Sequence, residues 1–193
     1  MNMSMNKTLD EAFDSKVLVA DCPYHVGLTR VVDAVVRGAN IPMAALLNDS
    51  RMYAKTAELD YVLNYPSLVD DNLYGLAFTS MSSTEVYKRM IGLSGMLIRN
   101  KKRVQLRTLH ELSDMIKSEE PIDKDCLFVP DFSIPDNGEV SDWLKQRLYS
   151  ILLMRVSKGL QTFLYVRDFK SLRVQFGDVF AEHIQQNFCI IET

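Results

Sequence analysis

The sequence predicts an α/β protein in which helices cover both faces of one parallel sheet, with a small helical appendage at the N-terminus. The first observation is that short apolar runs alternate with longer helix-like runs from residue 73 onward. Strands joined through helices form parallel sheets, and the helices then cover the two faces of the sheet. The second observation is the run LFVP at 127–130, which is apolar at successive positions, as in a strand buried on both faces.

Composition and charge restrict the class of protein. The chain has 193 residues, of which 47% are hydrophobic and 24% are charged, and this suits one compact domain with a small appendage. A formal net charge of −3 argues against general nucleic-acid binding. Three widely spaced cysteines offer neither a disulfide framework nor paired zinc ligands. The start, MNMSMNKTLDEAF, is unlike a signal peptide, and no apolar run reaches the ~20 residues that span a bilayer, so we expect a cytoplasmic protein without membrane partners.

The first 66 residues are expected to form the appendage and the lead-in to the core. Residues 16–20 are predicted as a strand, and residues 29–36 as a short helix that ends at Gly38. After a break at the sequence NIP, residues 43–66 are predicted as one helix, because the residue before a proline disfavours helical backbone.

Residues 67–193 are expected to form the core. Strands are predicted at 74–79, 103–108, 126–130, 161–166 and 188–192, and helices at 84–99, 109–118, 140–156, 169–175 and 177–186. The helix at 140–156 has apolar residues at helical spacing, with Ser141 as its N-cap, and Trp143 is expected in the core. Asp131 follows the strand at 126–130, at the edge where open parallel sheets bind ligands.

The corner between residues 74–79 and 84–99 is a possible phosphate-binding site. Such a strand–turn–helix corner binds phosphates when glycines let backbone N–H groups surround them and a lysine neutralises their charge. Here the corner reads TSMSST, with Ser82, Ser83 and Thr84 at its helical end, and it contains neither glycine nor lysine. The sequence therefore predicts a corner that lacks the positive charge needed to bind the phosphates of a nucleotide.

The order of these pieces resembles the AAA+ domain of the DnaC/DnaI/IstB group, the bacterial helicase loaders and transposition ATPases. ANIP at 39–42 resembles the element before the ATPase core, and residues 74–108 resemble the P-loop unit with the strand that follows it. LFVPDFS at 127–133 resembles the Walker B strand. WLKQRLYSILLMRVSKGLQTFLYV, at 143–166, resembles a block with Arg, Gly and Thr at the spacing of Arg155, Gly159 and Thr162. The resemblance covers residues 39–193 and implies a three-layer αβα P-loop NTPase fold.

Four parts of the nucleotide site depart from the family pattern. The phosphate loop has lost its glycines and lysine, and one carboxylate of the Walker B pair is missing beside Asp131. Arg167 stands at the position of the sensor asparagine, and His183 at that of the C-terminal sensor arginine. An earlier stretch, CPYHVGLT at 22–29, keeps Gly and Thr at P-loop spacing, but it too lacks the lysine. The departures predict a pseudo-ATPase without a cofactor or metal.

The resemblance implies a binding role in DNA replication, with a replicative helicase or an active AAA+ loader or initiator protein as partner. Such a protein would suit a phage or mobile element. Arg155 and Arg167 are the expected partner contacts, with Arg155 at the family's arginine-finger position; the alternative for Arg155 is a solvated arginine at a helix end.

Two other functions stay open from the sequence. One is an atypical ATPase whose Ser/Thr loop still holds nucleotide. The other is an accessory factor that binds single-stranded DNA through basic residues close together in the sequence, although such a run is usually a solvated helix end. These residues are Arg99, Lys101, Lys102, Arg103 and Arg107, with Lys88 and Arg89 expected on the same face.

Overall fold

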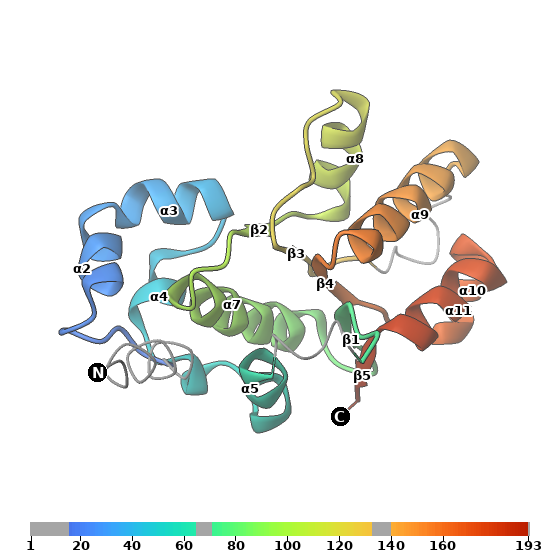
Figure 1. The fold of residues 1–193 in the computed structure, drawn as a ribbon. Coiled ribbons are helices and arrows are strands. Elements are labelled where there is room, and N and C mark those ends of the chain that lie inside the picture. Colours follow the sequence, from blue (N-terminus) through green and yellow to red (C-terminus); the bar gives the residue numbers. More distant parts are fainter. Residues whose placement is uncertain (1–15, 65–70, 133–139, 193) are drawn as a thin grey trace.

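The structure, a computed structural model, describes residues 16–64, 71–132 and 140–192 and confirms the predicted α/β fold. Five parallel strands form one sheet in the order β2-β3-β4-β1-β5 (Figure 1). The strands are β1 (Gly75–Phe78), β2 (Val104–Leu106), β3 (Cys126–Val129), β4 (Gln161–Tyr165) and β5 (Cys189–Ile191). All five were predicted, and each is shorter than predicted by one or more residues.

The core helices, with the exception of α11, begin where the sequence offers a side chain to cap them. They are α7 (Ser83–Arg99), α8 (Leu109–Lys117), α9 (Asp142–Ser157), α10 (Phe169–Phe176) and α11 (Asp178–Asn187). Ser82, Thr108, Ser141 and Asp168 each accept a hydrogen bond from the backbone N–H three residues further along. Such caps satisfy N–H groups that the first helical turn leaves unpaired.

Alternate residues of the strands build two hydrophobic layers, one on each face of the sheet. Leu76 and Phe78 of β1 pack with Phe128 and Phe163 on the face covered by α7 and the appendage. Ala77 lies on the opposite face, which α8, α9, α10 and α11 cover. Figure 1 shows these helices on both sides of the sheet, which is the predicted three-layer arrangement.

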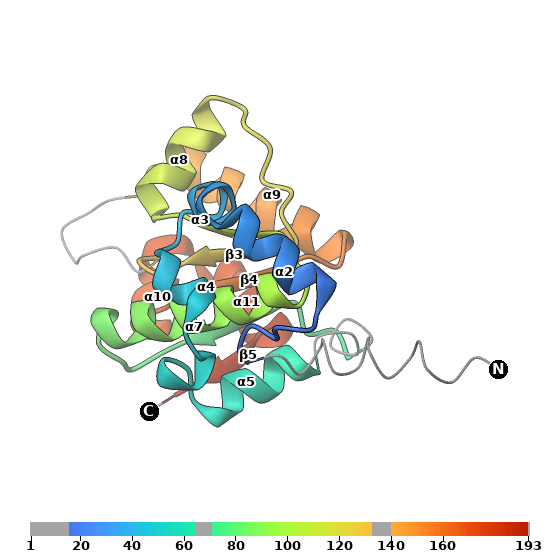
Figure 2. The same cartoon turned by 90° about the vertical axis from the view of Figure 1, so that its left-hand side faces the viewer.

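The appendage differs from the sequence prediction. It consists of α2 (Pro23–Arg30), α3 (Val32–Ala39), α4 (Met43–Leu47), the 3-10 helix η1 (Ser50–Met52) and α5 (Thr56–Leu63). The strand predicted at 16–20 is wrong: the carbonyl of Lys16 accepts hydrogen bonds from Ser50 N–H and the Arg99 side chain, and no strand lies beside it among the described residues. Figure 2 views the molecule from the appendage side, where α2, α3 and α4 lie in front of the core.

The helix boundaries in the appendage were also wrong. The helix predicted at 29–36 is divided between α2 and α3, and Asn40, with φ 57°, ends α3 two residues after Gly38. The single helix predicted at 43–66 is interrupted after Leu47, where Asn48 and Asp49 have extended backbone. The Asp49 carboxylate accepts the N–H of Arg51, a local bond that competes with a continuous helix. Pro66 lies outside the described residues.

Two glycines of α7 allow the appendage to approach closely. A Cβ at Gly95 would overlap the carbonyl oxygen of Ala45 in α4, and one at Gly92 would lie 2.5 Å from the Cβ of Tyr53. The α7 helix therefore contacts the sheet on one side and the appendage on the other. It joins the appendage to the core together with β2, which contacts α3, and β4, whose Gln161 accepts a hydrogen bond from Tyr61.

Candidate functional site

The carboxyl ends of β3, β4 and β1 bring the predicted site residues to one edge of the sheet. Because these strands are adjacent and parallel, the segments that follow them lie along the same edge. Asp131 follows β3, Arg167 follows β4, and residues 79–82 follow β1. The structure thus brings these three segments to the same edge of the sheet.

The corner between β1 and α7 is fixed by hydrogen bonds to its neighbours. The N–H of Thr79 donates to Ile191 O (2.9 Å), and the N–H of Ser80 donates to Arg167 O (3.3 Å). The Tyr165 hydroxyl donates to Met81 O (2.9 Å). Ser80 has φ 58°, a left-handed conformation that glycine adopts at lower cost. Three backbone polar groups of this corner therefore form hydrogen bonds within the protein.

A hydrophobic side chain and a buried ion pair lie beneath the corner. Met81 is 7% exposed, and its sulfur lies 2.9 Å from Nη1 of Arg89. Arg89 forms an ion pair with Glu58 of α5, and both side chains are buried. The guanidinium also lies over the ring of Phe78, 5.4 Å from its centroid. Because the Glu58 carboxylate already neutralises this cation, Arg89 does not replace the missing lysine.

The three hydroxyl residues at the start of α7 are exposed. Ser82 caps the helix, because its Oγ accepts the N–H of Glu85 at 3.2 Å. Ser83 and Thr84 occupy the first turn. Hydroxyl groups can donate hydrogen bonds to an anion, but they supply no positive charge.

Asp131, just after β3, accepts a hydrogen bond from the start of α8. Its Oδ1 accepts the N–H of Leu109, the first residue of α8, at 2.8 Å. Burial raises the pKa of this carboxyl, and the bond from Leu109 opposes that effect. The next residue, Phe132, is buried and stacks on Phe176 and Phe180. An aromatic side chain therefore occupies the position next to Asp131 where a second carboxylate could stand.

Arg155 is buried, which corrects both sequence interpretations of this residue. Its side chain is 0% exposed and lies within the core, so it is neither a solvated arginine nor a surface contact for a partner. The guanidinium donates to Thr162 Oγ1 (2.8 Å), Gln161 O (2.5 Å) and Lys124 O (3.0 Å). The family-like spacing of Arg155, Gly159 and Thr162 thus places Arg155 where it forms a hydrogen bond from α9 to Thr162 of β4.

Arg167 is exposed at the end of β4. Its carbonyl accepts the N–H of Ser80, so its backbone helps to fix the corner. Its predicted contact with a partner stays a prediction.

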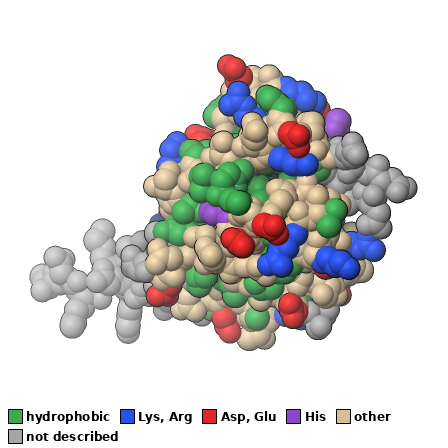
Figure 3. Space-filling model, turned by 90° about the vertical axis from the view of Figure 1, so that its right-hand side faces the viewer, with side chains coloured by type: hydrophobic (Ala, Val, Ile, Leu, Met, Phe, Trp, Pro, Cys, Tyr) green, Lys and Arg blue, Asp and Glu red, His purple; other side chains and the backbone are tan. Residues whose placement is uncertain are grey.

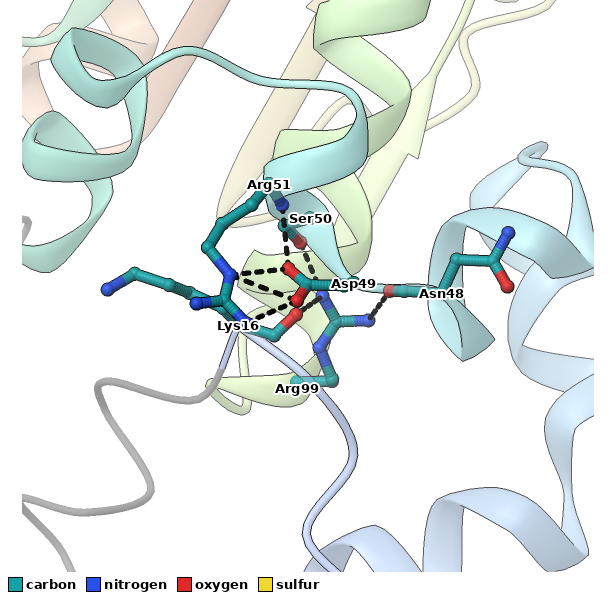
Figure 4. Close-up of polar contacts among 6 residues, drawn as sticks. All are labelled: Lys16, Asn48, Asp49, Ser50, Arg51 and Arg99. Carbon is teal, nitrogen blue, oxygen red and sulfur yellow. Dashed lines mark hydrogen bonds and ion pairs between the residues drawn. The ribbon is translucent and has the colours of Figure 1, made fainter.

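The residues of the predicted basic cluster do not form one continuous surface. Arg99 is 0% exposed and donates to Leu46 O at 2.7 Å. It also donates to Lys16 O at 2.7 Å (Figure 4). Arg103 forms an ion pair with Asp125 at 2.9 Å, and Arg107 donates to the carbonyl of Leu106. Lys101 lies over the ring of Tyr24, 5.7 Å from the ring centroid, and Lys102 is half-buried. Lys88 and Arg89 were expected on the same face as this cluster, but only Lys88 is exposed, whereas Arg89 is buried. Burial of Arg99 and Arg89 removes two cations from the predicted nucleic-acid surface.

His25, in α2, is buried and forms hydrogen bonds with two backbone groups. His25 accepts the N–H of Val19 on Nδ1 (2.8 Å), so Nε2 carries the proton and donates to Arg99 O (3.0 Å). In the part of the chain that the structure describes, no group of three His, Cys, Asp or Glu residues could hold a metal ion. Among the same residues, no helix is long and apolar enough to cross a membrane.

The comparisons with known proteins agree with this architecture. The crystal structure of the DnaC helicase loader matches with a TM-score of 0.52 over 72% of this chain and 90% of that chain, at 14% sequence identity. The fold, a parallel sheet with helices on both faces, is therefore similar to that of the DnaC helicase loader. No family model and no curated protein matches the sequence.

Proposed function

We propose that this protein is a catalytically inactive relative of the AAA+ helicase loaders, which acts in DNA replication by binding a replicative helicase or an active AAA+ protein. The observation that carries the proposal is a DnaC-like fold whose corner between β1 and α7 contains neither glycine nor lysine. Met81 is buried there, and Tyr165 and Arg167 bind the corner backbone.

Charge supports the proposed inactivity. A triphosphate and its metal need a lysine and paired acidic or hydroxyl ligands, held in a fixed geometry. The first turn of α7 offers hydroxyl groups and the carboxylate of Glu85 but no lysine or arginine, and Arg89 forms an ion pair with Glu58. The Asp131 carboxylate already accepts the N–H of Leu109, and the next residue, Phe132, offers no second carboxylate for a metal ion.

Nucleotide titration tests the inactive state. We expect no heat of binding when Mg-ATP is titrated into the full chain, and no phosphate release above a buffer blank. An active AAA+ loader is the positive control. If turnover occurs and disappears in Asp131→Ala, the protein is an atypical ATPase and the proposal of inactivity fails.

A separate measurement tests the partner. The full chain is immobilised and exposed to a purified replicative helicase and to a purified AAA+ loader, each with and without ATP. We expect saturable binding to one of them. Absence of binding to both would contradict the assignment to helicase loading.

A further inference from the structure

The segment that precedes α2, residues 16–21, is attached to its neighbours by polar side chains. We call it the N-terminal strap; it contains neither helix nor strand. At its start, the Lys16 carbonyl accepts hydrogen bonds from the buried Arg99 side chain (2.7 Å) and from Ser50 N–H (3.0 Å) (Figure 4). In its middle, the Val19 N–H donates to Nδ1 of His25 at 2.8 Å. A histidine therefore holds the middle of the strap on α2.

The hydrogen bonds of His25 require a neutral ring with one particular tautomer. The side chain is 1% exposed, and its second nitrogen, Nε2, lies 3.0 Å from the carbonyl oxygen of Arg99 at the end of α7. A backbone N–H can only donate and a backbone carbonyl can only accept, so Nδ1 is the bare nitrogen and Nε2 carries the proton. A second proton can enter the ring only at Nδ1. That position is already occupied by the N–H of Val19.

The surroundings of His25 offer no compensation for a positive charge on the ring. Its two contacts across the structure are backbone groups, and no carboxylate among the described residues forms an ion pair with it. The Tyr24 ring lies against it, with centroids 5.9 Å apart, and carries Lys101 on its face. The other titratable or charged residues of the strap, of α2 and α3 and of the end of α7 are Lys16, Asp21, Cys22, Arg30, Asp33, Arg37, Arg99 and Lys102. A buried charge without a counter-ion is unfavourable, so a charged His25 favours a conformation in which water reaches the ring.

A histidine on the surface has neither of these constraints. Figure 3 shows one side of the surface, on which Lys and Arg side chains lie close to Asp and Glu side chains. His110 on α8 is such a surface histidine: its side chain is 85% exposed, and its Nε2 lies 3.5 Å from a carboxylate oxygen of Asp114. Water and a carboxylate would both stabilise a proton on His110. His110 is therefore the matched comparison for His25.

Apolar packing holds the strap only weakly. Val17 and Val19 are 39% and 40% exposed, and Leu18 is half-buried against the core. Three strap residues, Leu18, Val19 and Ala20, line a cleft of about 360 Å³ together with His25, Val26 and Thr29 of α2. A segment with few buried apolar contacts opens at a low cost in free energy. The hydrogen bond between Val19 and His25 is therefore a large part of what keeps the middle of the strap in place.

We propose that His25 is a pH-sensitive latch for the N-terminal strap. As the pH falls, a proton from solvent binds Nδ1, the hydrogen bond from Val19 N–H breaks, and that N–H turns to water. The released state binds one proton more than the latched state, so the equilibrium between them shifts toward release by at most tenfold per pH unit. Release opens the cleft beside α2 and exposes Leu18, close to the point where residues 1–15 join the described chain. The latch does not depend on the proposed function.

Amide hydrogen exchange of the full chain, followed by NMR spectroscopy at pH 7.5 and 5.5, tests the latch. Each rate is divided by the rate of an unprotected amide at the same pH, which gives a protection factor. The protection factor of Val19 should fall by about tenfold at pH 5.5, because a solvent-accessible histidine becomes mostly protonated between these two values. The amide of Lys102, which donates to Leu97 O (2.9 Å) at the end of α7, is the control and should change by less than about twofold. Equal changes at Val19 and Lys102 would overturn the latch.

Two variants identify the titrating group. In His25→Asn the side-chain amide oxygen takes the place of Nδ1 and can accept the Val19 N–H, but it does not gain a proton in this pH range. The protection factor of Val19 should then be the same at both pH values within about twofold. His110→Asn is the matched control and should keep the tenfold response of the parent protein. A response in His25→Asn as large as in the parent would overturn the latch, and if this variant does not fold, the comparison of Val19 with Lys102 in the parent decides.

Discussion

The guanidinium of Arg99, at the end of α7, lies 2.7 Å from the carbonyl oxygen of Leu46, at the end of α4. The same side chain donates to Lys16 O and to the hydroxyl of Ser50 (Figure 4). The Ser50 hydroxyl in turn donates to Gly92 O at 2.9 Å. The last carbonyls of a helix have no partner within the helix, and a planar guanidinium can satisfy several of them together. One buried arginine thus joins three parts of the appendage to the core.

Replacing Arg99 by Met should destabilise the protein by about 3 kcal/mol or more, because several buried carbonyls lose their donor and each costs roughly 1–3 kcal/mol. Urea unfolding of both proteins measures this difference. Arg103→Met is the control from the same run of the sequence: its ion pair with Asp125 is largely exposed, and such pairs contribute at most about 1 kcal/mol. Equal losses in the two variants would show that Arg99 does not have the proposed role.

Gly95→Ala should loosen the appendage. The added Cβ would overlap the carbonyl oxygen of Ala45, so α4 and α7 must separate, at a cost of roughly 1–3 kcal/mol. The control is Gly38→Ala, in α3, where nothing lies within 4 Å of the added Cβ. At position 38 alanine should stabilise the protein by about 0.5–1 kcal/mol, because alanine loses less backbone entropy on folding than glycine does. Thermal unfolding that gave both variants the same sign of change would contradict the close packing of α4 on α7.

The sequence was sufficient for the core because the alternation of strands and helices is a local pattern with strong signals. Ser82, Thr108 and Ser141 are caps that can be recognised in the sequence, and the helices begin directly after them. The appendage was harder to predict. Its short helices are interrupted by side-chain bonds such as Asp49 to Arg51, and they are stabilised by contacts with α7 that are distant in sequence.

The sequence placed Asp131 and Arg167 after two strands, and the structure shows that these strands are adjacent and parallel, so the two residues lie at one edge of the sheet. It could not show the burial of charged side chains. Arg99 and Arg155 both lie in the last turn of a helix, where a solvated arginine is common, yet their hydrogen bonds reach residues that only the fold brings close. The buried Glu58–Arg89 pair was missed for the same reason. Trp143 was expected in the core but is exposed, because apolar residues occur on both faces of α9.

Arg155→Ala should lower the free energy of unfolding by about 3 kcal/mol or more. The truncation removes the N–H groups that donate to Thr162 Oγ1, Gln161 O and Lys124 O. It also leaves a cavity between α9 and β4. Differential scanning calorimetry of the full chain measures the loss as a lower midpoint. A surface arginine would give a nearly unchanged midpoint, so that result would show that Arg155 is not buried in solution. Arg147→Glu on the same helix is the control and should leave the midpoint within about 2 °C, since surface substitutions change stability by about 0.5 kcal/mol or less.

The stability of the fold should depend on the protonation of His183. This side chain is 9% exposed, packs edge-on against Tyr149 with ring centroids 5.6 Å apart, and has a buried Nε2 with no hydrogen-bond partner among the described residues. Burial lowers the pKa of His183, because the charged imidazolium loses its hydration. In the unfolded chain the imidazole takes up a proton as the pH falls through about 6.5, whereas in the folded protein it stays neutral to lower pH.

The unfolded state therefore binds more protons in this window, so the free energy of unfolding should decrease as the pH falls below about 6.5, by at most about 1.4 kcal/mol per pH unit from this residue. Urea unfolding at pH 7.5, 6.5 and 5.5 measures the slope. His183→Gln removes the titrating group, so the variant should be less stable than the parent at pH 7.5 and should lose part of that disadvantage at pH 5.5. His110→Gln, which removes a histidine whose side chain is 85% exposed, is the matched control. A constant difference between His183→Gln and the parent protein at all three pH values would show that His183 is not held neutral by the fold.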